Sequence, residues 1–136
     1  MKARLFCYGT LQSEAIFSAI TGVVPPRQRA VLHGYACYRV KRATYPGIVA
    51  VKQGCVAGTL YQGLNGLALN RLDQFEGGFY QREELEVITD AGQAISAWVY
   101  VIKRDCRHLL TRDAWRYDDY EPLFLERFFN PNGKPM

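Results

Sequence analysis

Four consecutive residues near the N-terminus, Tyr8-Gly9-Thr10-Leu11, have the pattern of an anion-binding turn. An apolar run turns sharply at a glycine there and leads into a predicted helix. Successive backbone N–H groups in such a turn, beside a helix N-terminus, form a cradle for an anion. Glycine also lets a ligand come close to the backbone. A plain strand-to-helix turn explains the same four residues, and the phosphate-binding pattern G-x-x-x-x-G-K-[ST] is absent from the sequence.

Glu76 is the second candidate for chemistry, because it stands at the end of a predicted helix among aromatic residues. The helix dipole disfavours a carboxylate at that end, and burial among Phe75, Phe79 and Tyr80 would raise the pKa of Glu76. A carboxylate whose pKa approaches neutrality is suited to act as a general base. A surface glutamate, tolerated at a small cost in free energy, fits the local pattern equally well.

The cysteines and histidines do not have the spacing of a metal site. No C-x-x-C pair occurs, and His33 and His108 lie far apart in the sequence. The acidic residues of Asp118–Glu121 have no nearby histidine or fourth ligand. We therefore expect no metal site. Three cysteines stand among apolar residues and are expected to act as small core side chains: Cys7, Cys37 and Cys55.

The composition is that of one folded domain, residues 1–136, with 49% hydrophobic and 22% charged residues. A disordered chain has less apolar surface. No apolar run reaches the roughly 18 residues of a membrane span, and the run before Gly9 is too short for a signal peptide. We therefore expect a cytoplasmic protein with no membrane contact. The net charge of +4 is scattered, which argues against a nucleic-acid partner.

Strands and helices alternate irregularly around these candidate residues. Helices are predicted at 12–20, with Ser13 as a possible N-cap, and from Asn65 to the stop at Gly77-Gly78. The tail at 115–129 is expected to pack over the sheet, partly as a short helix. Strands are predicted at 4–8, 30–32, 35–40, 48–51, 55–61, 84–87 and 97–102. Because the order is not a regular βαβ alternation, we expect an α+β fold: a small mixed β-barrel flanked by two or three helices.

Three stretches together resemble the gamma-glutamylcyclotransferase-like family, which includes the plant avirulence-induced-gene proteins and small bacterial proteins. Tyr8–Leu11 matches the family's Y-G-[ST]-L loop. Leu72–Glu76, followed by Tyr80–Arg82, matches its L-D-x-[FYL]-E…Y-x-R segment. Tyr45–Gly47, which also fits a turn or a pocket wall, and Val56–Tyr61 match its middle strands. The order and spacing of the three stretches fit from about Leu5 to Ile102.

The resemblance implies a mixed barrel with a pocket at one mouth and an enzyme that needs no cofactor. Its reaction would convert a γ-glutamyl amide, either a γ-glutamylamine or a γ-glutamyl peptide, to 5-oxoproline and a free amine. Glu76 would be the acid/base. The substrate would be held by Tyr8, Gly9, Thr10, Leu11 and Tyr80. At Gln12, some members that act on γ-glutamylamines carry lysine, which leaves the identity of the amine open.

Two other functions compete with this one. The first is a non-catalytic binding module on the same fold, for a small carboxylate ligand or a protein partner. A pure carboxylate binder gains nothing from Glu76, unless its ligand also carries an ammonium group. The second is a nucleic-acid-binding barrel, which would need exposed aromatic residues such as Tyr35, Tyr38 and Tyr61.

Overall fold

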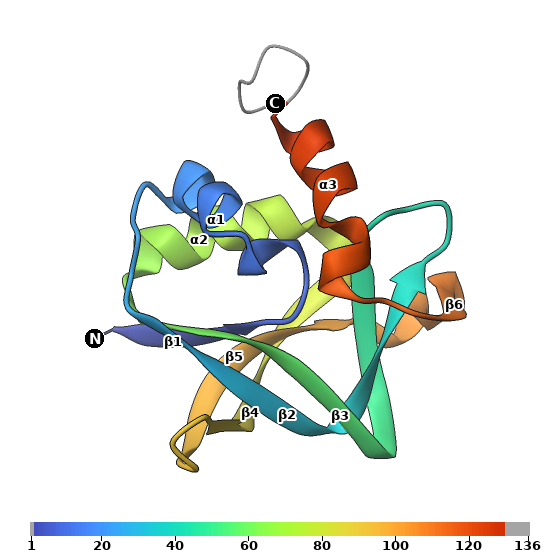
Figure 1. The fold of residues 1–136 in the computed structure, drawn as a ribbon, viewed down its shortest axis with the longest axis horizontal. Coiled ribbons are helices and arrows are strands. Elements are labelled where there is room, and N and C mark those ends of the chain that lie inside the picture. The colour runs from blue at the N-terminus through green and yellow to red at the C-terminus, as the bar shows by residue number, and fades with distance from the viewer. Residues whose placement is uncertain (1, 130–136) are drawn as a thin grey trace.

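A computed structural model describes residues 2–129 and contains one six-stranded sheet with three α-helices gathered on one side of it (Figure 1). The strands are β1 (Ala3–Cys7), β2 (Arg27–Val40), β3 (Pro46–Leu64), β4 (Tyr80–Thr89), β5 (Ala94–Ile102) and β6 (Leu110–Ala114). The α-helices are α1 (Glu14–Thr21), α2 (Gly66–Glu76) and α3 (Tyr117–Phe128). Three 3-10 turns connect them: η1 (Thr10–Gln12), η2 (Gly77–Phe79) and η3 (Arg104–Leu109).

The sheet closes into a barrel because β3 pairs with both β1 and β2. The strand order is β3-β1-β5-β4-β2-β6, and the extra β3–β2 pairing joins the ends of a five-stranded ring, with β6 added at β2. β1 and β5 run parallel, whereas the other pairs are antiparallel. The predicted α+β fold, a mixed barrel with flanking helices, is confirmed.

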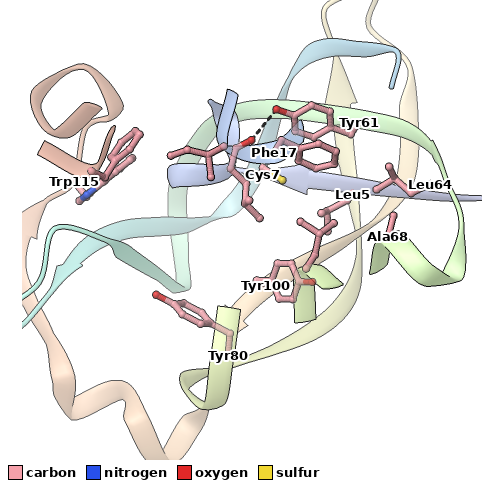
Figure 2. Close-up of a cluster of buried hydrophobic side chains, with 13 residues drawn as sticks. Leu5, Cys7, Phe17, Tyr61, Leu64, Ala68, Tyr80, Tyr100 and Trp115 are labelled. Carbon is pink, nitrogen blue, oxygen red and sulfur yellow. Dashed lines mark hydrogen bonds between the residues drawn. The ribbon is translucent and has the colours of Figure 1, made fainter. Parts of the chain in front are cut away.

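Alternate residues of the central strands fill two separate cores. Phe6 of β1 and Val99 of β5 lie in the cluster inside the barrel. Leu5, Cys7 and Tyr100 lie in the cluster between the barrel and the helices (Figure 2). Because successive side chains of a strand point to opposite faces, β1 and β5 must be apolar on both sides. The helix-side cluster is the one that surrounds the candidate site.

Both predicted helix starts are confirmed. The side chain of Ser13 accepts a hydrogen bond from the Ile16 N–H, 3.3 Å away, and that of Asn65 accepts one from the Ala68 N–H at 2.9 Å. The helix α2 ends before Gly77, whose φ of 77° suits glycine. This ending places Glu76 in the last turn of α2.

The four short strands predicted between 30 and 61 are two long strands, β2 and β3, so the breaks predicted at 33–34 and 52–54 are wrong. The pairing instead becomes irregular between His33 and Tyr35 and then continues. A Cβ atom on Gly54 would stand 2.3 Å from the Tyr35 carbonyl oxygen. Glycine at this position therefore lets two curving strands pass closely, which a barrel requires.

Three side chains lie elsewhere than the sequence suggested. Cys7 is buried, but Cys55 is exposed and Cys37 only half-buried, so Cys55 is not a core residue. Tyr61, considered as an exposed aromatic, is fully buried and stacks on Phe17 with ring centroids 3.9 Å apart. Pro46 begins β3 opposite Arg39 and is not a central turn residue, whereas the alternative interpretation as a pocket wall is confirmed for Tyr45 and Pro46.

None of the helices among residues 2–129 combines the length and apolar character that a membrane crossing needs.

Candidate active site

The turn after β1 and the end of α2 meet at one cavity of about 410 Å³. All the residues singled out in the sequence line this cavity: Tyr8, Gly9, Thr10, Leu11, Glu76 and Tyr80. Residues from the N-terminal turn, the end of α2 and the start of β4 are thus brought together by closure of the barrel. Their roles in binding and catalysis remain predictions.

Every carbonyl oxygen of the Tyr8–Leu11 turn accepts a hydrogen bond from the protein. The side chain of Gln12 donates to the Tyr8 oxygen at 2.8 Å, and the Gln12 N–H donates to the Gly9 oxygen at 3.0 Å. The Ser13 N–H donates to the Thr10 oxygen at 3.0 Å. The Tyr61 hydroxyl donates to the Leu11 oxygen at 2.7 Å, the dashed line of Figure 2.

These hydrogen bonds determine which polar groups of the turn are available to bind a ligand. The carbonyl oxygens, which would repel an anion, are all engaged by protein donors. The first N–H groups of a helical turn have no acceptor within that turn. The turn is therefore suited to bind an anion through N–H groups.

Gly9 packs closely against a proline in the cavity wall. A Cβ atom at Gly9 would stand 3.0 Å from Cγ and 3.2 Å from Cδ of Pro46, which also lines the cavity. Any larger residue would push the proline ring. Glycine at position 9 is thus explained by close approach, and its φ of −113° lies outside the left-handed region that favours glycine.

Glu76 is a half-buried residue that lines the cavity, and the pKa of its carboxyl group is raised to about 8. The main cause is loss of water around the charged form, and the negative charge of Asp73, one turn earlier in α2, adds to it. The aromatic neighbours predicted to bury Glu76 do so only in part. Phe75 and Phe79 are 39% and 38% exposed, although both line the cavity.

Three tyrosines and a cysteine lie close enough to Glu76 for its negative charge to affect their pKa values. The negative charge of Glu76 contributes to raised pKa values at Cys7, Tyr8, Tyr80 and Tyr100, in each of which burial is the larger cause. Figure 2 shows Cys7, Tyr80 and Tyr100 within the same buried cluster. All four groups are therefore neutral near pH 7, and Glu76 is the group of this set that titrates near neutrality.

The tyrosine hydroxyls donate to protein acceptors. Tyr8 donates to the Tyr100 carbonyl oxygen at 2.6 Å, and Tyr80 donates to the Pro46 carbonyl oxygen at 2.5 Å. Tyr100 donates to Oδ1 of Asp73 at 2.7 Å. These bonds fix the rings in place as rigid walls and engage the hydroxyl protons of all three tyrosines within the protein.

Asp73 anchors the end of α2 to the sheet. Nε of Arg82 lies 2.7 Å from Oδ1 of Asp73, and an Nη2–Oδ2 distance of 3.1 Å completes a two-pronged pair. The guanidinium of Arg82 in turn stacks over the Trp98 ring at 4.8 Å. Asp73 is therefore a structural carboxylate and not a simple solvated one on the helix surface.

Sequence reasoning missed Tyr100 and the contribution of α3. Tyr100, Phe124, Arg127 and Phe128 all line the cavity. Tyr100 was visible only as one residue of the strand predicted at 97–102, and the resemblance noted in the sequence ended at about Ile102. Among residues 2–129, no group of three or more His, Cys, Asp or Glu side chains forms a site for a metal ion.

A family model described as gamma-glutamyl cyclotransferase, AIG2-like, matches residues 5–121. The chain belongs to this family. Its similarity to other AIG2-like proteins runs over nearly the whole chain. It is 30% identical to protein AIG2 C of Arabidopsis thaliana, over 97% of this chain and 87% of that protein. It is 34% identical to AIG2-like protein C of the same plant, over 96% and 82%.

Solved structures of AIG2-like proteins and cyclotransferases share the fold. A solution structure of an Arabidopsis thaliana protein aligns with a TM-score of 0.74 at 30% identity, over 100% of this chain and 89% of that one. A structure named gamma-glutamyl cyclotransferase aligns with a TM-score of 0.69 at 20% identity, over 76% and 68%. At that identity the second likeness shows the fold alone.

Proposed function

We propose that this chain is a cyclotransferase that converts a γ-glutamyl amide into 5-oxoproline and a free amine. One observation carries the proposal. A carboxyl group whose pKa is about 8, Glu76, shares a cavity with a turn whose carbonyl oxygens are all engaged by the protein. Membership of the cyclotransferase-like family agrees with this chemistry.

The two charged groups of a γ-glutamyl head match the two polar features of the cavity. The α-carboxylate fits the N–H groups of the Tyr8–Leu11 turn. The α-ammonium fits Glu76, because an ionised carboxylate and an ammonium group stabilise each other in a site that holds little water. Pairing with the substrate would therefore favour the ionised form of Glu76.

The reaction then needs proton transfers and a folded substrate. Glu76 takes a proton from the α-ammonium, and the freed amine nitrogen attacks the γ-carbonyl carbon. A carbon–nitrogen bond forms and closes the five-membered ring, and the original amide bond breaks. The two protons that the attacking nitrogen sheds end on the departing amine, with Glu76 as carrier. Nucleophile and electrophile belong to one molecule, so the protein mainly has to hold that molecule folded.

A binding module for a γ-glutamyl ligand is the second candidate. Glu76 would then serve only as the partner of the ligand's ammonium group. The same cavity and the same turn fit that role, so turnover is what separates the two functions.

The test is a panel of γ-glutamyl amides and peptides, scored for 5-oxoproline. We expect turnover of at least one of them. In Glu76→Gln, turnover should fall roughly 10² to 10⁴-fold, because glutamine keeps the shape but accepts no proton. Glu86→Gln, an exposed glutamate on β4, is the matched control and should keep full activity. Binding of these ligands without any turnover would establish the binding module instead.

A further inference from the structure

The cavity has an aromatic rim, formed by residues from three parts of the chain. Its members are Tyr45, Phe75, Phe79, Phe124 and Phe128. Phe75 of α2 and Phe128 of α3 meet edge to face with ring centroids 6.0 Å apart. The rim therefore joins the end of α2, the β2–β3 connection and α3 into one apolar wall.

Much of this wall faces solvent. Among the large hydrophobic side chains that are exposed in residues 2–129, the aromatic ones are Tyr45, Phe75 and Phe79, at 36%, 39% and 38%. All three line the cavity. Aromatic side chains that gather in the exposed part of one pocket are typical of a surface that a ligand covers.

The γ-glutamyl head cannot be what covers the rim. Both charges of that head stand on its α-carbon, and the polar groups that match them are the Tyr8–Leu11 turn and Glu76, not the apolar rim. The part of the substrate beyond the γ-carbonyl group, which becomes the departing amine, is what remains to contact the rim.

The charged side chains of the cavity also limit which departing amine can bind. The charged side chains among the described residues that line the cavity are Glu76 and Arg127. Glu76 already faces the ammonium group of the head. Arg127, in the last turn of α3, would repel an amine that carries a second positive charge.

We propose that the departing amine carries an aromatic or similarly large apolar group, as in γ-glutamyl-phenylalanine. This substrate class rests on the proposed cyclotransferase function. The α-nitrogen forms a bond to the γ-carbonyl carbon, the bond between that carbon and the amide nitrogen of phenylalanine breaks, and phenylalanine leaves with both protons from the attacking nitrogen. The aromatic ring stays against the rim throughout.

The experiment compares γ-glutamyl-phenylalanine with γ-glutamyl-alanine and with γ-glutamyl-putrescine, whose free end is cationic. Phenylalanine and alanine are similar leaving amines, so a difference between their substrates reports contact with the ring. We expect kcat/KM for γ-glutamyl-phenylalanine to exceed that for γ-glutamyl-alanine by about ten- to a hundredfold, the usual effect of burying an aromatic side chain. The cationic substrate should be the poorest.

Phe79→Ala removes one ring of the rim and should lower kcat/KM for γ-glutamyl-phenylalanine by about tenfold. The value for γ-glutamyl-alanine should change less than twofold, because alanine does not reach the rim. Leu67→Ala is the matched control, since Leu67 is an exposed apolar residue of α2, at 58%, and is not part of the cavity lining. It should change neither value.

Calorimetry measures the affinity of the protein for each of the three substrates. Compared with turnover, these affinities distinguish failure of this inference from failure of the cyclotransferase function. If γ-glutamyl-phenylalanine binds more tightly than the alanine and putrescine substrates but yields no 5-oxoproline, the cyclotransferase function is overturned and the preference for an aromatic group is supported. Equal or better turnover of the alanine or putrescine substrate would overturn the aromatic site and keep the function. Absence of both turnover and preferential binding would overturn both.

Discussion

Glu76 owes its chemical character to the residues around it. A glutamate at the end of a helix ordinarily stays ionised at neutral pH, but the cavity wall and Asp73 raise the pKa of this one to about 8. Gly9 shows the same dependence on surroundings, because the ring that restricts position 9 belongs to Pro46, at the start of β3. The properties of single residues in the site thus depend on residues that are distant in the sequence but close in space.

Gly9→Ala should weaken ligand binding and leave the protein folded at a modest cost in stability. The new methyl group would press on Pro46 and narrow the approach to the turn, so we expect KM to rise about tenfold, the effect of disturbing one charge-assisted hydrogen bond. The cost in stability should stay near 1–3 kcal/mol, as for a modest overpacking. Enzyme kinetics and thermal unfolding measure the two effects.

Gly66→Ala is the control for Gly9→Ala, because a Cβ atom at Gly66 meets open space at the start of α2. It should leave KM unchanged and hold or raise the melting temperature, since alanine favours a helix. A Gly9→Ala protein that is less stable but has an unchanged KM would make Gly9 a purely structural residue.

The connection between α2 and β4 aligns Glu76 with the cavity. Asp73 on α2 and Arg82 on β4 bind each other through two contacts, and Tyr100 on β5 adds a third. These contacts tie the last turn of α2 to two neighbouring strands. The same anchor carries the negative charge that helps to raise the pKa of Glu76.

Asp73→Asn should therefore shift the pH dependence of the reaction. A general base must be ionised, so kcat/KM should rise with pH and level off above about pH 8, the pKa of Glu76. Without the nearby negative charge, that pKa falls and the rise should move to lower pH. Rate profiles against pH measure the shift.

Asp113→Asn controls for the loss of an ion pair. It breaks the partly exposed Arg39–Asp113 pair, whose Nη2–Oδ2 distance is 3.0 Å, away from the cavity lining. Asp113→Asn should lose about 0–1 kcal/mol of stability, as exposed pairs usually do, and Asp73→Asn should lose more because its carboxylate also accepts a hydrogen bond from buried Tyr100. Equal shifts of the pH profile in both variants, or a shift in neither, would contradict the role of Asp73.

Closure of the barrel also makes stability depend on the protonation of Glu76. The folded pKa of about 8 lies above the ordinary value of 4.5. The folded state therefore binds this proton more tightly than the unfolded state does. The stabilising contribution is fully present below about pH 4.5 and is lost as pH rises toward about 8.

Glu76→Gln should for this reason become relatively more stable as pH rises. Near pH 5 its melting temperature should match the parent protein, and near pH 8 it should be higher by roughly a few degrees. The exposed Glu86→Gln should show no such trend with pH. A constant difference between Glu76→Gln and the parent over this range would mean that the folded protein does not hold Glu76 in its neutral form.

The sequence by itself determined the local elements and the identity of the candidate residues. Ser13 and Asn65 start helices because their side chains cap the first turn, and this needs only neighbouring residues. The Tyr8–Leu11 and Leu72–Glu76 patterns, with Tyr80, were enough to suggest the family and the lining of one side of the cavity. Each of these features depends on short stretches of chain.

Only the tertiary structure decided what depends on contacts between distant segments. The strands β2 and β3 continue through Gly34 and Gly54 because pairing between them outweighs the local tendency of glycine to end a strand. Tyr61 is buried because Phe17 of α1 covers it, and Tyr100 reaches the site because β5 pairs with β4. The aromatic rim exists because α3 packs beside the end of α2. Local sequence patterns contain no information on which distant surfaces meet, so burial, the pKa of Glu76 and the shape of the cavity follow from the closed barrel.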